Sequence, residues 1–214
     1  MTVPQGYYEA RLPADTRRDI LWRALWKYYL AGIVAPDDCV LDLGAGYGHF
    51  INAVVAQRRI AVDAWPGFLP FLAAGVEGHV GLATNLSMLD DRTIDFAFAS
   101  NLFEHLTRFD FEVTLASLAP KMSPGGTLTI LQPNYRYAYR EYFDDFDHKS
   151  IYSHISLPQY LTSQGWTVID VQPRFMPMTI IGRLPVSPWL IRLWLLSPWR
   201  PIGKQMLVRA RLRP

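Results

Sequence analysis

The sequence has little cysteine and little excess charge. Cys39 is the only cysteine among 214 residues, which excludes an intramolecular disulfide framework and a zinc site built from cysteines. Lysine and arginine total 21 and aspartate and glutamate total 19, so the formal net charge is only +2. Broad nucleic-acid-binding surfaces are strongly basic, so we expect no nucleic-acid partner.

Long hydrophobic runs are also missing. The first residues show no basic start followed by an apolar run, so we expect no secretory signal. The most apolar late stretch, residues 189–196, is much shorter than the roughly 20 residues needed to cross a bilayer, and it contains Arg192. The sequence predicts a cytoplasmic protein that at most touches the inner membrane as a peripheral protein.

Aromatic residues, by contrast, are plentiful. The chain has 7 Trp, 11 Tyr and 11 Phe, together 14% of its residues. Its length suffices for one large domain with a small addition. Many aromatic residues fall in the first predicted helix, after the fifth predicted strand and late in the chain. This distribution points to an apolar or sugar-stacking binding pocket more than to a heavy core.

The apolar pattern alternates between strands and helices. Strands are predicted at 39–43, 60–62, near 80, and at 94–99, 127–131, 166–171 and 206–212. Helices are predicted at 15–34, 51–55, 68–74, 111–119, 157–164, 189–196 and 199–204. Such alternation predicts an α/β fold with a mainly parallel sheet covered on both faces.

A glycine-rich turn follows the first predicted strand. Residues 41–48 read LDLGAGYG and open a helix, and Asp63 ends the next strand, where a carboxylate can accept both hydroxyls of a ribose. The dinucleotide fingerprint would need a glycine at position 49, where this sequence has His49. Asp42, just before the turn, would repel a pyrophosphate but suits a cationic ammonium or sulfonium ligand.

Four segments, in the same order, resemble the class I S-adenosylmethionine-dependent methyltransferases. They are residues 40–48, Asp63, residues 94–106 and residues 118–128 with their Pro-Gly-Gly turn. The resemblance implies a Rossmann-like, doubly wound, seven-stranded sheet with an antiparallel last strand. It implies a helical cap at 1–37, a cofactor-binding domain at 38–175, a helical and proline-rich insertion at 176–205 and the last strand at 206–214.

The resemblance also implies S-adenosylmethionine as cofactor and places residues around it. Asp42 would lie near the amino group, Asp63 on the ribose, and Ser100 at the mouth of the site. Leu82 stands where the family often has an acidic residue facing the adenine, so Asn85 with Leu86 is the expected substitute. The implied cofactor-binding set is Asp42, Gly44, Ala45, Gly46, Gly48, Asp63, Ala64, Asn85, Leu86 and Ser100.

Three histidines are candidates for the general base. Methyl transfer to a hydroxyl needs a base, and histidine titrates near neutral pH. His105 follows the fourth predicted strand, and His148 and His154 follow the fifth; each also has a plain structural interpretation. Acidic residues 144, 145 and 147 with these histidines include metal-ligand types, but no tight ligand spacing recurs, so we expect no metal site.

The late insertion has three open interpretations. It is a lid or wall of the acceptor pocket, a patch on a membrane surface, or a contact between two copies of the chain. In the membrane interpretation, residues 189–204 form a peripheral contact, with tryptophans at the interface and basic side chains toward anionic headgroups. The side chains concerned are Trp189, Trp194, Trp199, Arg183, Arg192, Arg200 and Lys204.

A narrower resemblance bears on the acceptor. Residues 100–106, 132–137, 146–148 and 203–206 resemble a bacterial subgroup associated with cell-surface glycan or lipid-linked sugar assembly. The sequence thus predicts a methyltransferase acting on oxygen or nitrogen of a small-molecule or lipid-linked acceptor. The alternatives are an NAD(P)-binding oxidoreductase of the Rossmann type and a non-catalytic binding protein for S-adenosylmethionine.

Overall fold

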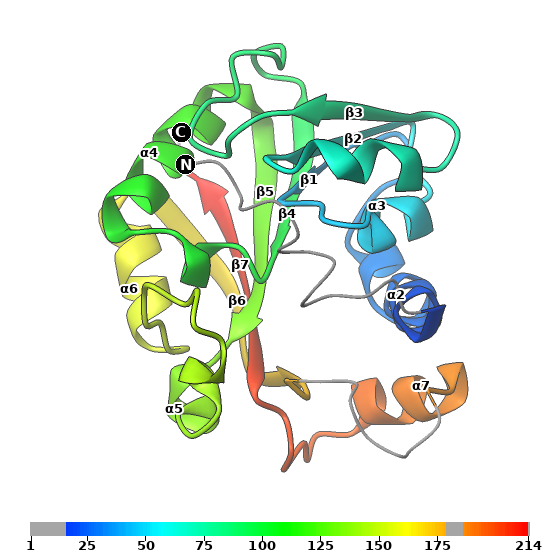
Figure 1. The fold of residues 1–214 in the computed structure, drawn as a ribbon, viewed down its shortest axis with the longest axis vertical. Coiled ribbons are helices and arrows are strands. Elements are labelled where there is room, and N and C mark those ends of the chain that lie inside the picture. The colour runs from blue at the N-terminus through cyan, green and yellow to red at the C-terminus, as the bar shows by residue number, and fades with distance from the viewer. Residues whose placement is uncertain (1–15, 179–185, 214) are drawn as a thin grey trace.

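A seven-stranded sheet forms the centre of the molecule (Figure 1). The structure is a computed structural model that describes residues 16–178 and 186–213. The strands are β1 (Cys39–Leu43), β2 (Arg58–Asp63), β3 (Val76–Val80), β4 (Ile94–Ser100), β5 (Met122–Pro133), β6 (Trp166–Met176) and β7 (Gln205–Leu212), in the order β3-β2-β1-β4-β5-β7-β6. Strand β7 runs antiparallel to both β5 and β6, and the other pairs are parallel. The predicted sheet with its antiparallel last strand is confirmed.

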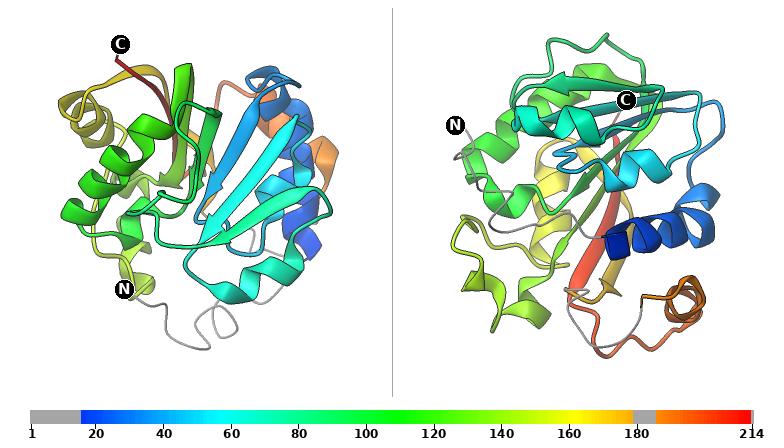
Figure 2. Two further views of the ribbon diagram at one scale, coloured as in Figure 1. Left: turned by 90° about the horizontal axis from the view of Figure 1, so that it is seen from above. Right: turned by 45° about the vertical axis from the view of Figure 1, so that its right-hand side comes forward.

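Helices cover both faces of the sheet (Figure 2). The α-helices are α2 (Thr16–Tyr28), α3 (His49–Ala53), α4 (Arg108–Leu118), α5 (Tyr135–Ala138), α6 (Ser156–Ser163) and α7 (Pro188–Leu196). Helices α2, α3 and α7 share one hydrophobic core with the sheet, and α4 and α6 share the other. Neighbouring residues of β1 divide between the two cores: Val40 points into the first, and Leu41 and Leu43 into the second. The predicted doubly wound arrangement follows from this alternation.

Prolines account for two differences from the predicted helices. The helix expected at 68–74 is a 3-10 turn, η2 (Pro66–Phe71), because Pro66 and Pro70 lack the N–H groups that an α-helix needs. The helix expected at 199–204 is absent from that described segment, which contains Pro201 and directly follows Pro198. The remaining 3-10 turns are η1 (Leu30–Gly32), η3 (Phe103–His105), η4 (Ala119–Lys121) and η5 (Tyr142–Asp144).

The chain order of the strands reverses at β1, and the carboxyl end of this strand is where open α/β sheets have their ligand-binding crevice. From β1 the chain builds β2 and β3 on one side, and then returns to place β4 on the other side. Open α/β sheets bind their ligands at this reversal point, beyond the carboxyl ends of the strands. Among the described helices, none is long and apolar enough to cross a membrane.

Candidate active site

The turn between β1 and α3 presents its backbone to this crevice. Gly44 and Gly46 have φ angles of +77° and +53°, in the left-handed region that glycine adopts without strain. The N–H groups of Gly44 and Ala45 donate to the carbonyl of Val62 at 2.8 and 3.2 Å, which fastens the turn to β2. Gly48 precedes the first residue of α3. The glycine residues assigned from the sequence therefore lie together on one rigid turn.

Asp63 ties the end of β2 to this turn. Its buried carboxylate accepts hydrogen bonds from the backbone N–H groups of Gly46, at 2.7 Å, and Trp65, at 2.8 Å. These two bonds fix the carboxylate, while a carboxylate offers about four acceptor sites in all. The contact of Asp63 with the ribose hydroxyls stays a prediction.

Asp42 is a buried carboxylate beside the same turn. It is 2% exposed, and its Oδ2 has no hydrogen-bond partner among the residues that the structure describes. Burial, together with the nearby charge of Asp63, raises the pKa of Asp42 to about 8. A buried carboxylate with an unpaired oxygen is costly unless a cation or donor meets it. The ammonium group of an amino-acid ligand fits this position.

Aromatic side chains line the β2 side of the crevice. The ring of Tyr47 lies 5.2 Å from that of Trp65 and 4.7 Å from that of Phe71, both edge to face. Ala64, assigned to the adenine, is half-buried between Asp63 and Trp65. Tyr47 is a candidate that sequence reasoning missed, although its place inside the glycine turn was a signal for a role at the site.

The remaining candidate cofactor-binding residues differ in their burial and hydrogen bonds. Asn85 is exposed, and its Oδ1 accepts a hydrogen bond from the N–H of Ser87 at 3.1 Å. Leu86 is fully buried in the core, and its N–H donates to Ser117 Oγ at 2.8 Å, so its side chain is closed off from solvent. Ser100 ends β4, and its hydroxyl accepts a hydrogen bond from Asn101 at 3.2 Å.

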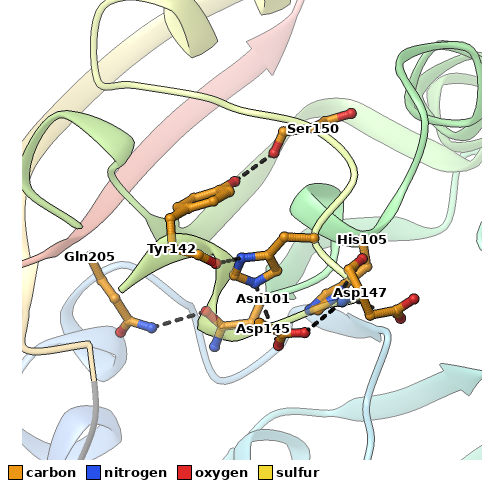
Figure 3. A network of polar contacts seen from close by, with 8 residues as sticks. Asn101, His105, Tyr142, Asp145, Asp147, Ser150 and Gln205 are labelled. Carbon is orange, nitrogen blue, oxygen red and sulfur yellow. Dashed lines mark hydrogen bonds and ion pairs between the residues drawn. The ribbon is translucent and has the colours of Figure 1, made fainter. Parts of the chain in front are cut away.

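Two of the three candidate histidines lie together next to this site (Figure 3). His105 lies in η3, directly after β4, and its ring is 4.8 Å from that of His148. His148 Nδ1 donates to the carbonyl of Tyr142 at 2.5 Å, and His105 Nδ1 lies 3.3 Å from the carbonyl of Asp147. Burial lowers the pKa of His105 below its ordinary value.

Glu104, which the sequence places beside His105 either to orient it or to face solvent, does not face solvent. It is fully buried, and neither carboxylate oxygen has a hydrogen-bond partner within residues 16–178 and 186–213. Burial raises the pKa of Glu104 to about 8. Its backbone carbonyl accepts hydrogen bonds from the N–H groups of Lys149 and Ser150 at 2.8 and 3.1 Å, which holds the loop with His148 against η3. The only sequence signal was its position between a buried aromatic residue and His105.

His154 belongs to a different set of contacts. The side-chain amide of the buried Asn134 lies 2.9 Å from His154 Nδ1 and donates to the carbonyl of Pro173 at the same distance. The ring of His154 stacks on Tyr137 with centroids 5.5 Å apart. The structure thus places His105 and His148 in one cluster and His154 in another, and the role of each in the reaction stays a prediction.

Comparison with known proteins identifies this arrangement. A family model described as a methyltransferase domain matches residues 14–171. The chain belongs to the S-adenosylmethionine-dependent methyltransferase family. It is an enzyme that uses S-adenosylmethionine, as the glycine turn with Asp42 and Asp63 indicated. This membership argues against the NAD(P)-binding oxidoreductase as an alternative.

Individual relatives agree with the family. The methyltransferase is 30% identical over 174 residues to malonyl-[acyl-carrier protein] O-methyltransferase of Methylococcus capsulatus; the match covers 72% of this chain and 62% of that relative. An S-adenosylmethionine-dependent methyltransferase from Archaeoglobus fulgidus has the same fold, with a TM-score of 0.67, 21% identity and coverage of 95% and 97% of the two chains. A Burkholderia thailandensis N-methyltransferase with bound S-adenosylhomocysteine superposes with a TM-score of 0.63 at 18% identity, covering 98% of this chain and 84% of its own.

Proposed function

We propose that the methyltransferase acts on a small acceptor carried on a lipid, at the surface of a membrane. S-adenosylmethionine supplies the electrophilic methyl group, and the chain has to align a nucleophilic oxygen or nitrogen with it. One observation carries the proposal: the chain places a row of exposed apolar side chains beside the carboxyl end of the sheet. Soluble proteins seldom expose large contiguous apolar patches without an interaction partner.

This apolar row lies on and just after α7. Trp189 is 62% exposed and Trp199 is 76% exposed. The other exposed apolar members are Leu190, Leu193, Leu196 and Ile202. The chain enters β7 at Gln205, which pairs with Pro133 at the carboxyl end of β5, so the row lies beside the end of the sheet where we expect the acceptor (Figure 1).

Some side chains that were expected to contact a membrane make contacts within the chain instead. Trp194 is not at the surface patch, because its Nε1 donates to the carbonyl of Phe175 at 2.8 Å. Arg200 is used within the chain, with its Nη2 donating to the carbonyl of Leu195 at 2.7 Å, and Lys204 pairs with Glu141. Arg183 lies outside the described residues. The proposed contact is therefore mainly apolar, and we expect little loss of binding at high salt.

A carrier-protein-linked acceptor is the second candidate. The relative from Methylococcus capsulatus is named for methylating malonyl groups on acyl-carrier protein, and it shares 30% of aligned residues with this chain. A carrier protein and a lipid anchor both present a small acceptor at the end of a long tether. The exposed apolar row favours the lipid, since an acceptor tethered to a carrier protein needs no membrane contact.

Two measurements test the proposal. Wild-type protein should pellet with neutral phosphatidylcholine vesicles, and a Trp189→Ser, Trp199→Ser variant should remain in the supernatant. Phe109→Ser is the matched control, because Phe109 is 72% exposed on α4, which covers the other face of the sheet. Label from radioactive S-adenosylmethionine should then appear in the organic extract of membranes. Label found only on malonyl-loaded carrier protein would favour the second candidate, and failure of the wild type to pellet would remove the membrane contact.

A further inference from the structure

The buried carboxylate of Glu104 and the two neighbouring histidines form an unassigned cluster. One ligand atom from each of Glu104, His105 and His148 lies within 4.8 Å of the others. They come from two segments, η3 and the loop after η5, which are held together by the backbone hydrogen bonds from Lys149 and Ser150 to Glu104. This cluster does not include Asp42 and Asp63, which we expect to contact the cofactor.

We propose that Glu104, His105 and His148 bind one divalent transition-metal ion beside the cofactor turn. Two imidazoles and one carboxylate are a ligand set that suits Zn²⁺ and other first-row ions such as Co²⁺. In a tetrahedral site, bonds of about 2.0–2.2 Å hold the ligand atoms roughly 3.3–3.6 Å apart, so the side chains have to close by about 1–1.5 Å around the ion.

The orphaned oxygens of Glu104 are the strongest argument for a ligand. The side chain is fully buried, and both oxygens lack a hydrogen-bond partner in the part of the chain that the structure describes. An isolated buried carboxylate costs several kilocalories per mole unless a cation or a donor compensates it. A divalent ion supplies that compensation, and the neighbouring imidazoles supply the rest of its coordination.

The orientation of His148 also fits a ligand. Its Nδ1–H donates to the carbonyl of Tyr142 at 2.5 Å, which fixes the tautomer with Nε2 as the basic nitrogen. A backbone carbonyl on the far nitrogen is the usual outer support of a metal-bound histidine. Asp145 Oδ2 lies 3.6 Å from this Nε2, so a carboxylate stands next to the proposed ion as well.

The cluster lies close to the cofactor turn. A Cβ atom placed on Gly44 would come within 3.0 Å of the Leu102 side chain, two residues before Glu104 in the sequence. His105 follows the end of β4, and Figure 3 shows it beside Asp147, whose Oδ2 lies 3.7 Å from His105 Nδ1. A metal ion here would stand on the acceptor side of the site; this placement rests on the proposed function, but the binding of the ion does not.

Titration of the metal-free full chain with Co²⁺ tests the site directly. We expect one equivalent of ion per chain, visible absorption bands of nitrogen and oxygen ligation, and displacement by Zn²⁺ but not by Mg²⁺. Glu104→Gln keeps the shape of the side chain, and His105→Ala removes one imidazole. Each should weaken Co²⁺ binding by at least about 100-fold, more than loss of an outer support does.

His79→Ala is the matched control, since His79 lies on the edge strand β3, away from the cluster. It should bind Co²⁺ as the wild type does. Thermal unfolding and S-adenosylhomocysteine binding show whether each variant is folded. Wild type without bound Co²⁺ or Zn²⁺, or equal binding by wild type and Glu104→Gln, would overturn the proposal. A failure of the proposed function would instead appear as absent vesicle binding or a different acceptor, with the metal site intact.

Discussion

The two halves of the carboxyl edge of the sheet are built differently. On the β1–β2 side, the contacts join nearby positions, such as Asp63 with Trp65 and with Gly46. On the β5–β7 side, they join distant segments: Gln205 Nε2 donates to Asn101 Oδ1 at 2.9 Å across 104 positions. The first half is therefore specified by a local motif and the second by tertiary packing. Substitutions in the two halves should separate cofactor binding from acceptor binding.

The largest expected effect is a loss of cofactor affinity when Asp63, at the end of β2, is replaced. Asp63→Asn removes the charge that we expect to hold the ribose hydroxyls, and hydrogen bonds to charged groups contribute about 1.5–3 kcal/mol each. We expect S-adenosylhomocysteine affinity, measured by calorimetry, to fall at least about 100-fold. Glu77→Gln is the control, because Glu77 is an exposed carboxylate on β3 that pairs with Arg58. Equal affinity of wild type and Asp63→Asn would contradict the assignment of the ribose.

Replacing Asp42 should have a smaller effect, and this effect should be a gain in the stability of the cofactor-free protein. An unfolded aspartate titrates near pH 4, whereas the pKa of folded Asp42 is raised to about 8 by burial and by Asp63. Between these values the folded state binds more protons, so the contribution of Asp42 lowers the stability as the pH rises from 4 to 8. Asp42→Asn removes this contribution and should stabilise the cofactor-free protein by about 2 kcal/mol at pH 8.

Urea unfolding at pH 6 and pH 8 measures this difference. The gain from Asp42→Asn should be larger at pH 8 than at pH 6, and the same variant should bind S-adenosylhomocysteine more weakly. A gain that is equal at both values would show that Asp42 does not titrate in this range. An unchanged affinity would show that it does not meet the cofactor, so the two readouts test separate statements.

The sequence predicts the β1–β2 half of this edge better than the β5–β7 half. The strand 39–43, the glycine turn, Asp42 and Asp63 all lie within the 25 residues 39–63, and a motif is enough to place them. Whether Glu104 is buried depends on the loop with Lys149 and Ser150 folding over it, more than 40 residues later in the chain. The same holds for Arg200, a residue expected at a membrane surface, whose Nη1 instead contacts Gln172 at 3.1 Å. No pattern of neighbouring residues in the sequence predicts these distant contacts.

The smallest effects should distinguish two tryptophans of the acceptor half. Trp194 is half-buried against the core and donates to the carbonyl of Phe175, so Trp194→Phe loses one hydrogen bond and should cost about 1 kcal/mol of unfolding free energy. Trp199 is 76% exposed, and Trp199→Gln should change stability by less than about 0.5 kcal/mol. Vesicle binding should show the reverse order, with Trp199→Gln weakened and Trp194→Phe close to wild type. If both variants lost stability equally and bound vesicles equally, residues 186–204 would have to pack differently from the structure, and the apolar row would no longer support a membrane contact.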